Sequence, residues 1–158
     1  MNNSTLEQKL MLLQEHIPFA AIEWNTRFEA IDWNQAATKL FGYTPAEAIG
    51  RHAVELIVPQ EARALVDSIF QSLLNQTGGT YSINRNRTKS GETLVCEWYN
   101  YPLRNERQEV IGVLSLALNI AATGEGDRTK VHSPLWETSP IANRFFTSSI
   151  DLLGVGGL

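Results

Sequence analysis

The segment from residue 61 to residue 120 constrains the fold most, because one strongly amphipathic helix is followed by three strand-like runs. Between Glu61 and Asn75 apolar residues recur at helical spacing and make a broad face. Three runs rich in strand-forming residues follow, separated by the turn sequences KSGE and RNERQ; the runs are TYSINRNRT, TLVCEWYNYPL and EVIGVLSLALNI. This order predicts an antiparallel sheet that buries one face beneath helices.

Two further strands are expected before the helices. Residues 19–25 (FAAIEWN) and 28–34 (FEAIDWN) mix apolar and polar positions over short lengths, which favours a β-hairpin. Asn34 can cap a short helix after it, and Thr44 with Glu47 makes a capping box at the start of another. The fold class is therefore α+β: a five-stranded antiparallel sheet with short helices and one long helix on one face.

An amphipathic helix is predicted at the N-terminus. Leu6, Leu10, Leu13 and Ile17 lie at helical spacing and form one apolar stripe, which Pro18 ends. A helix of this length needs a surface to pack on. That surface is either the domain's own sheet or a second copy of the chain, and the sequence leaves both open.

The chain divides into three parts on this interpretation. Residues 1–18 form the N-terminal helix, residues 19–121 the α+β domain, and residues 122–158 a linker and an irregular tail without clear periodicity.

Charge and composition narrow the classes of partner. The net charge of -4 argues against nonspecific nucleic-acid binding. No apolar run is long enough to cross a bilayer, and the polar start MNNSTLEQK does not resemble a signal peptide. A single cysteine excludes an internal disulfide. We expect a cytoplasmic protein with no nucleic-acid or membrane partner, although a soluble part of a membrane receptor would have the same composition.

Three stretches together resemble a PAS domain. They are residues 31–59 (IDWNQAATKLFGYTPAEAIGRHAVELIVP), residues 88–103 (TKSGETLVCEWYNYPL) and residues 109–120 (EVIGVLSLALNI). The resemblance implies a noncatalytic sensory module that senses a small ligand or a partner. It would regulate a signalling effector, in cis or in trans, such as the histidine kinase of a two-component system or a cyclic-dinucleotide enzyme. The alternative is a ligand-free dimerisation or protein-interaction module.

The same resemblance implies a homodimer. The chain also departs from the pattern of the family in two respects. Members of the family often dimerise through a helix before the first strand, which makes Leu6, Leu10, Leu13 and Ile17 the candidate interface. Where signalling members commonly end the last strand with Asp-Ile-Thr, this chain has Asn-Ile-Ala at residues 119–121. No kinase, cyclase or DNA-binding motif follows in the sequence.

The cofactor chemistries of the family do not match the residues present. Flavin photosensors carry their reactive cysteine on the central helices, whereas Cys96 lies in a late strand-like run. Haem-binding members present a histidine from the long helix, and residues 61–75 contain none. We therefore expect neither a flavin–thiol adduct nor a histidine-ligated haem, and the cofactor is left unknown. The three histidines and one cysteine show no metal-ligand spacing.

A catalytic role finds little support in the sequence. Cys96 with His52 is the only candidate pair of nucleophile and base, and a thiol on a strand is usually a small buried apolar group. We expect no enzyme activity, no catalytic residues and no metal site.

The run TLVCEWYNYPL presents two faces. Strand alternation places Leu94, Cys96, Trp98 and Asn100 on one side and Val95, Glu97, Tyr99 and Tyr101 on the other. The sequence leaves open which side meets a pocket. The candidate pocket residues are Trp33, His52, Ile69, Cys96 and Trp98. Residues 84–89 (NRNRTK) are expected to do no more than solvate a hairpin end.

Overall fold

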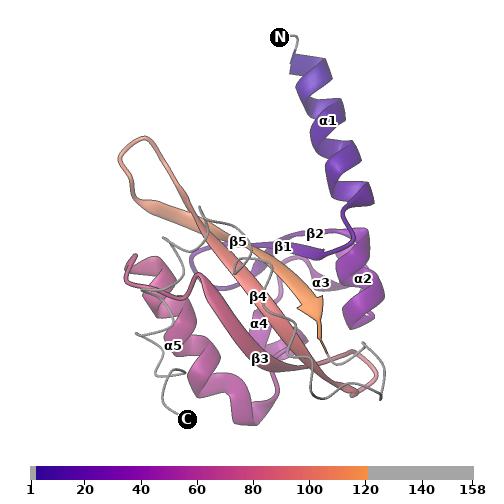
Figure 1. The fold of residues 1–158 in the computed structure, drawn as a ribbon, viewed down its shortest axis with the longest axis vertical. Coiled ribbons are helices and arrows are strands. Elements are labelled where there is room, and N and C mark those ends of the chain that lie inside the picture. The colour runs from indigo at the N-terminus through magenta and orange to yellow at the C-terminus, as the bar shows by residue number, and fades with distance from the viewer. Residues whose placement is uncertain (1–2, 121–158) are drawn as a thin grey trace.

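One antiparallel sheet of five strands organises the computed structural model, which describes residues 3–120 (Figure 1). The strands are β1 (Ala20–Trp24), β2 (Ala30–Trp33), β3 (Tyr81–Arg87), β4 (Thr93–Arg104) and β5 (Val110–Asn119). Their order across the sheet is β2-β1-β5-β4-β3. The last strand of the sequence therefore lies at the centre of the sheet, and the predicted fold class is confirmed.

Four α-helices and one short 3-10 helix lie between β2 and β3. They are α2 (Gln35–Phe41), α3 (Pro45–Ala48), α4 (Ala53–Leu56), the 3-10 helix η1 (Gln60–Ala62) and α5 (Arg63–Leu74). Helix α2 packs on β1, and α5 packs on β4 and β5. The long helix was expected to begin at Glu61, but that residue belongs to the 3-10 helix, so the α-helical part starts two residues later.

Local capping signals formed as predicted. The Asn34 side chain accepts a hydrogen bond from the backbone N–H of Ala37 at 2.9 Å and thereby caps α2. Gly42 ends the same helix with a φ of 86°, a conformation that glycine adopts without steric cost. Thr44 and Glu47 form a complete capping box on α3. These side chains fix where each short helix begins and ends.

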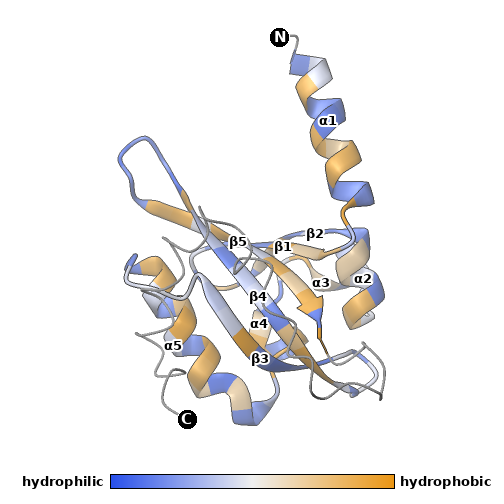
Figure 2. Cartoon of the chain, in the orientation of Figure 1, coloured by the Kyte–Doolittle hydropathy of each residue, from blue (hydrophilic) through white to orange (hydrophobic). Residues whose placement is uncertain are grey.

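The N-terminal helix α1 (Asn3–His16) projects from the rest of the fold (Figure 1) and touches it near its C-terminal end, where Gln14 Nε2 donates a hydrogen bond to Asp32 Oδ2 at 2.7 Å. None of its residues is buried, and Leu6, Leu10 and Leu13 are 48%, 56% and 59% exposed. Apolar bands are visible along its projecting surface (Figure 2). Leu6, Leu10 and Leu13 therefore do not cover the domain's own sheet, whereas Ile17, which follows the helix, is half-buried. The predicted tail, residues 122–158, lies outside the described residues.

Two turns of the protein share one backbone geometry. In residues 25–29 (NTRFE) and 105–109 (NERQE), the leading asparagine side chain accepts hydrogen bonds from the N–H groups two and four residues later, at 2.9 and 3.0 Å. The fourth residue of each turn has a positive φ, 62° for Phe28 and 64° for Gln108. The two turns therefore differ chiefly in the side chain that this left-handed position carries.

The first and last strands in the sequence, β1 and β5, are neighbours in the sheet. Ala20, where β1 begins, pairs with Ala117 near the end of β5. Because the two strands are antiparallel, the connection from α1 and the end of the described chain meet the sheet at the same side.

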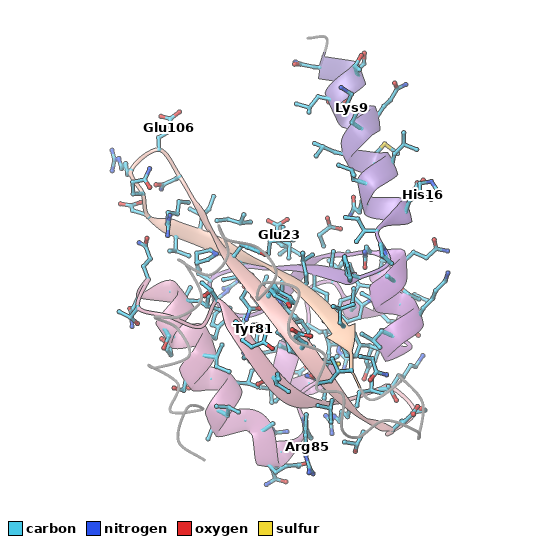
Figure 3. The ribbon with its side chains drawn as sticks, in the orientation of Figure 1. Lys9, His16, Glu23, Tyr81, Arg85 and Glu106 are labelled. Atoms are coloured by element: carbon cyan, nitrogen blue, oxygen red, sulfur yellow. The ribbon has the colours of Figure 1, made fainter. Side chains whose placement is uncertain are left out.

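Two acidic side chains oppose each other across β1 and β2. Glu23, which is labelled in Figure 3, pairs with Asp32. Partial burial, reinforced by the negative charge of Asp32, raises the pKa of the Glu23 carboxyl. A raised folded-state pKa gives stability that is fully present below the unfolded-state pKa and is lost as pH rises through the folded-state pKa. The ionised Glu23 therefore opposes folding at neutral pH.

Glu23→Gln is expected to raise the melting temperature at pH 7 by roughly 1–3 °C, because it removes this unfavourable charge. The gain should disappear below about pH 4, where the wild-type carboxyl is already protonated in both states. Thermal melts of both proteins at pH 7 and pH 3.5 check this. An equal gain at both pH values would contradict the electrostatic cause.

Candidate functional site

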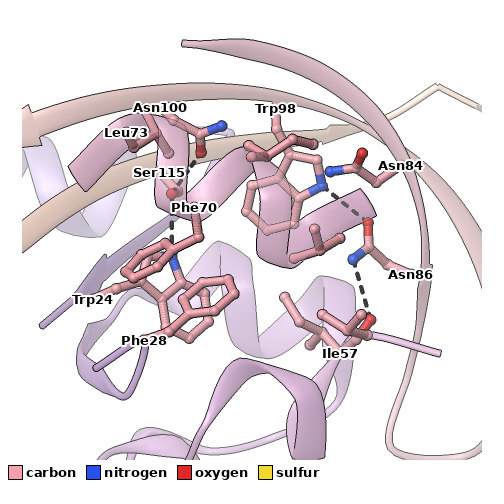
Figure 4. A pocket seen from close by; sticks show the side chains of 13 residues that line it. Trp24, Phe28, Ile57, Phe70, Leu73, Asn84, Asn86, Trp98, Asn100 and Ser115 are labelled. Atoms are coloured by element: carbon pink, nitrogen blue, oxygen red, sulfur yellow. Dashed lines mark hydrogen bonds between the residues drawn. The ribbon is translucent and has the colours of Figure 1, made fainter. Parts of the chain in front are cut away.

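A cavity of about 30 Å³ lies between α5 and the inner face of the sheet (Figure 4). Its lining comes from β1, β3, β4 and β5, the turn between β1 and β2, the loop before η1, and α5: Trp24, Phe28, Ile57, Val58, Val66, Ile69, Phe70, Leu73, Asn84, Asn86, Trp98, Asn100 and Ser115. A water molecule needs roughly 10–15 Å³ of such space, so the cavity has room for about two waters.

The sheet side of this cavity is polar. On β3 the inward positions carry Ser82, Asn84 and Asn86, while Asn100 on β4 and Ser115 on β5 continue the polar surface. All five side chains are buried. Buried amides and hydroxyls lower stability unless they are hydrogen-bonded. The partners of these side chains therefore show which of them serve the fold and which are left with an unpartnered atom.

Asn86 is fully engaged. Its Oδ1 accepts a hydrogen bond from Trp98 Nε1 at 2.9 Å, and its Nδ2 donates to the carbonyl of Ile57 at 3.1 Å. The side chain is only 1% exposed and joins β3, β4 and the loop before η1. Asn86 therefore has a structural role.

A second chain of hydrogen bonds crosses three strands. Trp24 Nε1 donates to Ser115 Oγ at 3.1 Å, and the Ser115 hydroxyl donates to Asn100 Oδ1 at 2.7 Å. Asn100 Nδ2 in turn donates to the carbonyl of Gly79 at 2.9 Å. These polar groups, too, are hydrogen-bonded within the protein and have a structural role.

Asn84 is different. Its Nδ2 donates to Ser82 Oγ at 3.1 Å, but its Oδ1 is buried without a hydrogen-bond partner among the described residues. An unpartnered buried acceptor costs about 1–3 kcal/mol. Asn84, a residue of the cavity lining, therefore carries one spare hydrogen-bond acceptor, its carbonyl oxygen.

Aromatic rings form the other end of the cavity. Phe28 stacks on Phe70 with ring centroids 4.0 Å apart and an interplanar angle of 16°. The same ring meets Trp24 edge-on at 5.0 Å and His52 edge-on at 5.5 Å. This end offers flat apolar surfaces and no hydrogen-bonding group of its own beyond the occupied Trp24 N–H.

The structure brings two of the five candidate pocket residues to the cavity. Ile69 and Trp98 line it. Trp33 instead packs against Phe41, with ring centroids 5.9 Å apart, and donates its Nε1 hydrogen to the carbonyl of Tyr43 at 3.1 Å. That Ile69 and Trp98 contact a ligand stays a prediction.

His52 and Cys96 lie outside the lining. The His52 Nδ1 accepts a hydrogen bond from the backbone N–H of Val54 at 3.2 Å, which caps α4. Cys96 is 0% exposed on β4, and burial raises the pKa of its thiol to about 12. Within residues 3–120 no contact joins these two side chains, and a thiol with this pKa is protonated, and therefore a poor nucleophile, at neutral pH.

The open question about the two faces of β4 is answered. Trp98 and Asn100 point to the cavity, whereas Glu97 lies on the opposite face. There the Glu97 Oε1 accepts hydrogen bonds from the hydroxyls of Tyr81 at 3.0 Å and Tyr99 at 2.6 Å. The pocket face is therefore the one that carries Leu94, Cys96, Trp98 and Asn100.

Sequence reasoning missed Asn84, Asn86 and Phe28. The run NRNRTK was interpreted as a solvated hairpin end, but only part of it is solvated: Arg85 is exposed, and Asn84 and Asn86 are 7% and 1% exposed. Strict alternation of asparagine with arginine in a strand was the available signal, since it turns one residue type inward and the other to solvent.

Metal ligands and membrane-spanning helices are not found in the described part of the chain. Within residues 3–120 no group of three or more His, Cys, Asp or Glu side chains is placed to hold a metal ion. No helix in the same range is long and apolar enough to cross a membrane.

Comparisons with known proteins agree on the fold. The family model described as the PAS fold matches residues 8–120. The PAS domain of a protein from Colwellia psychrerythraea is 21% identical, with a TM-score of 0.63, and the match covers 73% of this chain and 97% of that one.

Two more solved structures are similar. The PAS domain of an HTR-like protein from Haloarcula marismortui is 17% identical over 74% of this chain and 93% of that one, with a TM-score of 0.60. A LOV protein of Rhodobacter sphaeroides is 13% identical over 78% and 71%, with a TM-score of 0.65. At these identities the likeness concerns the fold alone. No curated protein sequence matches the chain significantly.

Proposed function

Because the chain belongs to the PAS family of signal-sensing modules, we propose that its cavity between α5 and the sheet binds a small ligand and that binding regulates a signalling effector. The observation that carries this proposal is the unpartnered Oδ1 of Asn84, buried in a cavity whose other side-chain amides are saturated. A fold that needed only stability would gain from an apolar residue there.

Transmission of the signal would use the sheet and α1. The hydrogen-bonded chain from Trp24 through Ser115 to Asn100 links the cavity to β1 and β5, the strands next to the connection from α1. We propose that α1 and the residue that follows it pair with the same segment of a second copy through Leu6, Leu10, Leu13 and Ile17, because within residues 3–120 the three leucines are exposed and Ile17 is only half-buried. A shift of β1 against β5 would then alter the packing of the dimer.

The proposed effector is a histidine kinase of a two-component system or a cyclic-dinucleotide enzyme, joined in cis or in trans. The module itself is proposed to be noncatalytic and to act in the cytoplasm. Burial of Cys96 and the capping role of His52 support the first point, since neither side chain is placed for nucleophilic chemistry. The acidic net charge of -4 supports the absence of a nucleic-acid partner.

The nature of the cofactor is also a proposal. Cys96 is absent from the lining, so the thiol that a flavin adduct needs is not at the cavity. His52 lies outside the lining and already uses its Nδ1 as an acceptor, and α5 contains no histidine, so within residues 3–120 no histidine faces the cavity as an axial ligand for haem. We therefore propose a noncovalent ligand that is neither a flavin–thiol adduct nor a histidine-ligated haem.

One observation favours the alternative, a ligand-free dimerisation module. The cavity has room for about two water molecules in its present shape, and the exposed leucine stripe is the larger apolar feature. Under this alternative the waters would satisfy Asn84 and no ligand would enter.

Val66→Phe separates the two functions, because Val66 lines the cavity and a phenyl group at that position fills it. Leu65→Phe is the matched control, since Leu65 is the adjacent residue of α5 and is 45% exposed. Native mass spectrometry and the absorbance spectrum of the purified proteins are expected to show a small molecule with the wild type and with Leu65→Phe, and none with Val66→Phe. An empty wild-type dimer whose assembly Val66→Phe leaves unchanged would support the alternative.

A further inference from the structure

Phe28 differs from every other residue that lines the cavity. The other 12 of the 13 lining residues are buried, and Phe28 alone is partly exposed. The lining therefore comes closest to the molecular surface at Phe28. Figure 4 shows this ring beside Phe70, on the opposite side of the cavity from Asn84.

The backbone of Phe28 is also unusual, since a φ of 62° is unfavourable for a residue with a bulky side chain. The matching turn at residues 105–109 places Gln108 at the same position with a φ of 64°, and Gln108 is exposed. The turn itself therefore does not require a buried aromatic residue. The phenyl ring at this position instead fills space that belongs to the cavity.

The backbone around this ring is held in place. The N–H of Phe28 donates to the carbonyl of Asn25, and its carbonyl accepts from the N–H of Ala53, both at 3.0 Å. Rotation of the side chain away from Phe70 would open the cavity with the turn left in place, at the loss of the ring contacts with Phe70, Trp24 and His52. The other walls belong to α5, the hydrogen-bonded sheet and the loop before η1.

The lining defines the chemistry of what could enter. No Asp, Glu, Lys, Arg or His side chain lines the cavity, so a charged ligand would be desolvated without a counter-charge. The stacked surface of Phe70 suits a flat ring. At the other end, the Asn84 Oδ1 needs a hydrogen-bond donor, whereas Asn86 and Asn100 are already satisfied.

We propose that the ligand is an uncharged planar molecule that replaces the Phe28 ring on Phe70 and donates one hydrogen bond to Asn84. Phe28 then sets the specificity, because it excludes ligands that do not gain enough from stacking to displace it. This inference rests on the proposed function and specifies its ligand class.

Indole and benzofuran test the proposal, since they have the same shape and only indole has an N–H donor. Titration calorimetry is expected to show that Phe28→Gly binds indole at least tenfold more tightly than the wild type. The variant should prefer indole over benzofuran by roughly fivefold to tenfold, the usual contribution of one hydrogen bond. Asn84→Leu in the Phe28→Gly background should abolish that preference.

Gln108→Gly is the matched control, because it relieves the same backbone conformation in the other turn without touching the cavity. It should bind indole as the wild type does. Should Phe28→Gly fail to fold, Phe28→Gln replaces it, since glutamine already occupies this position in the second turn. Equal affinity of wild type and both Phe28 variants for indole, or equal affinity of Phe28→Gly for the two probes, would overturn the inference.

The two proposals fail in different ways. A wild-type protein that retains a small molecule which Val66→Phe excludes, together with a Phe28→Gly variant that does not take up indole, leaves the proposed function intact and refutes the inference. If Val66→Phe also changes neither ligand content nor dimer, the proposed function fails as well.

Discussion

Asn86→Leu is expected to lower the free energy of unfolding by about 2–4 kcal/mol. The substitution leaves the indole N–H of Trp98 buried without its acceptor, since Asn86 Oδ1 is the group that receives it at 2.9 Å. The carbonyl of Ile57 also loses one of two hydrogen bonds and keeps the one from the backbone N–H of Arg87 at 2.9 Å. Urea unfolding followed by far-UV circular dichroism measures the change.

Asn84→Leu is the matched control. It removes the same amide from the same strand at similar burial, 7% against 1%, but this amide has an unpartnered oxygen. Its loss should leave the free energy of unfolding within about 1 kcal/mol of the wild type or raise it. If both variants are destabilised equally, Asn84 has a structural role and the argument for a ligand contact at that position fails.

Simultaneous replacement of Leu6, Leu10 and Leu13 by serine should convert the proposed dimer to monomer. The three side chains are 48–59% exposed in the single chain, and their burial between two copies would supply most of the apolar contact of α1. Each replaced side chain should cost the dimer on the order of 1 kcal/mol of binding free energy in each copy. The dissociation constant of the dimer should therefore rise at least a thousandfold. Sedimentation velocity over a range of protein concentrations measures this.

Leu12→Ser provides the control for the leucine substitution. Leu12 is 55% exposed on the same helix but lies off the stripe, because two residues along a helix turn the side chain through about 200°. It should leave sedimentation unchanged. A triple variant that sediments like the wild type would rule out the α1 stripe as the interface.

Features that depend on a few neighbouring residues could be predicted from the sequence. The caps at Asn34 and Thr44 require only one side chain and the backbone three residues later, so the local sequence determines them. The number of strands and their antiparallel pairing followed from the strand-like runs on either side of the helices, whereas the order of the strands across the sheet was not predicted. These signals lie within short segments, and no distant contact competes with them.

The position of α1 and the state of Asn84 depend on contacts between distant segments. The leucine stripe at 6, 10 and 13 is compatible with packing inside one domain or between two chains, and only the direction in which the chain leaves β1 decides between them. Asn84 and Asn86 have the same residue type and the same facing, yet the loop carbonyl of Ile57 and the Trp98 N–H lie beside only one of them. Phe28 is likewise recognised as part of the cavity wall only when its partner Phe70, from α5, is placed.

The pairing of Ala20 with Ala117 has a mechanical consequence. A receptor whose input and output segments leave from opposite ends of a domain must carry a signal through its whole body. Here the connection from α1 and the end of β5 lie on neighbouring strands, so a slip of β1 past β5 would displace the two relative to each other. Because α1 is a helix of 14 residues, a small rotation where it joins the sheet would become a larger displacement at its far end.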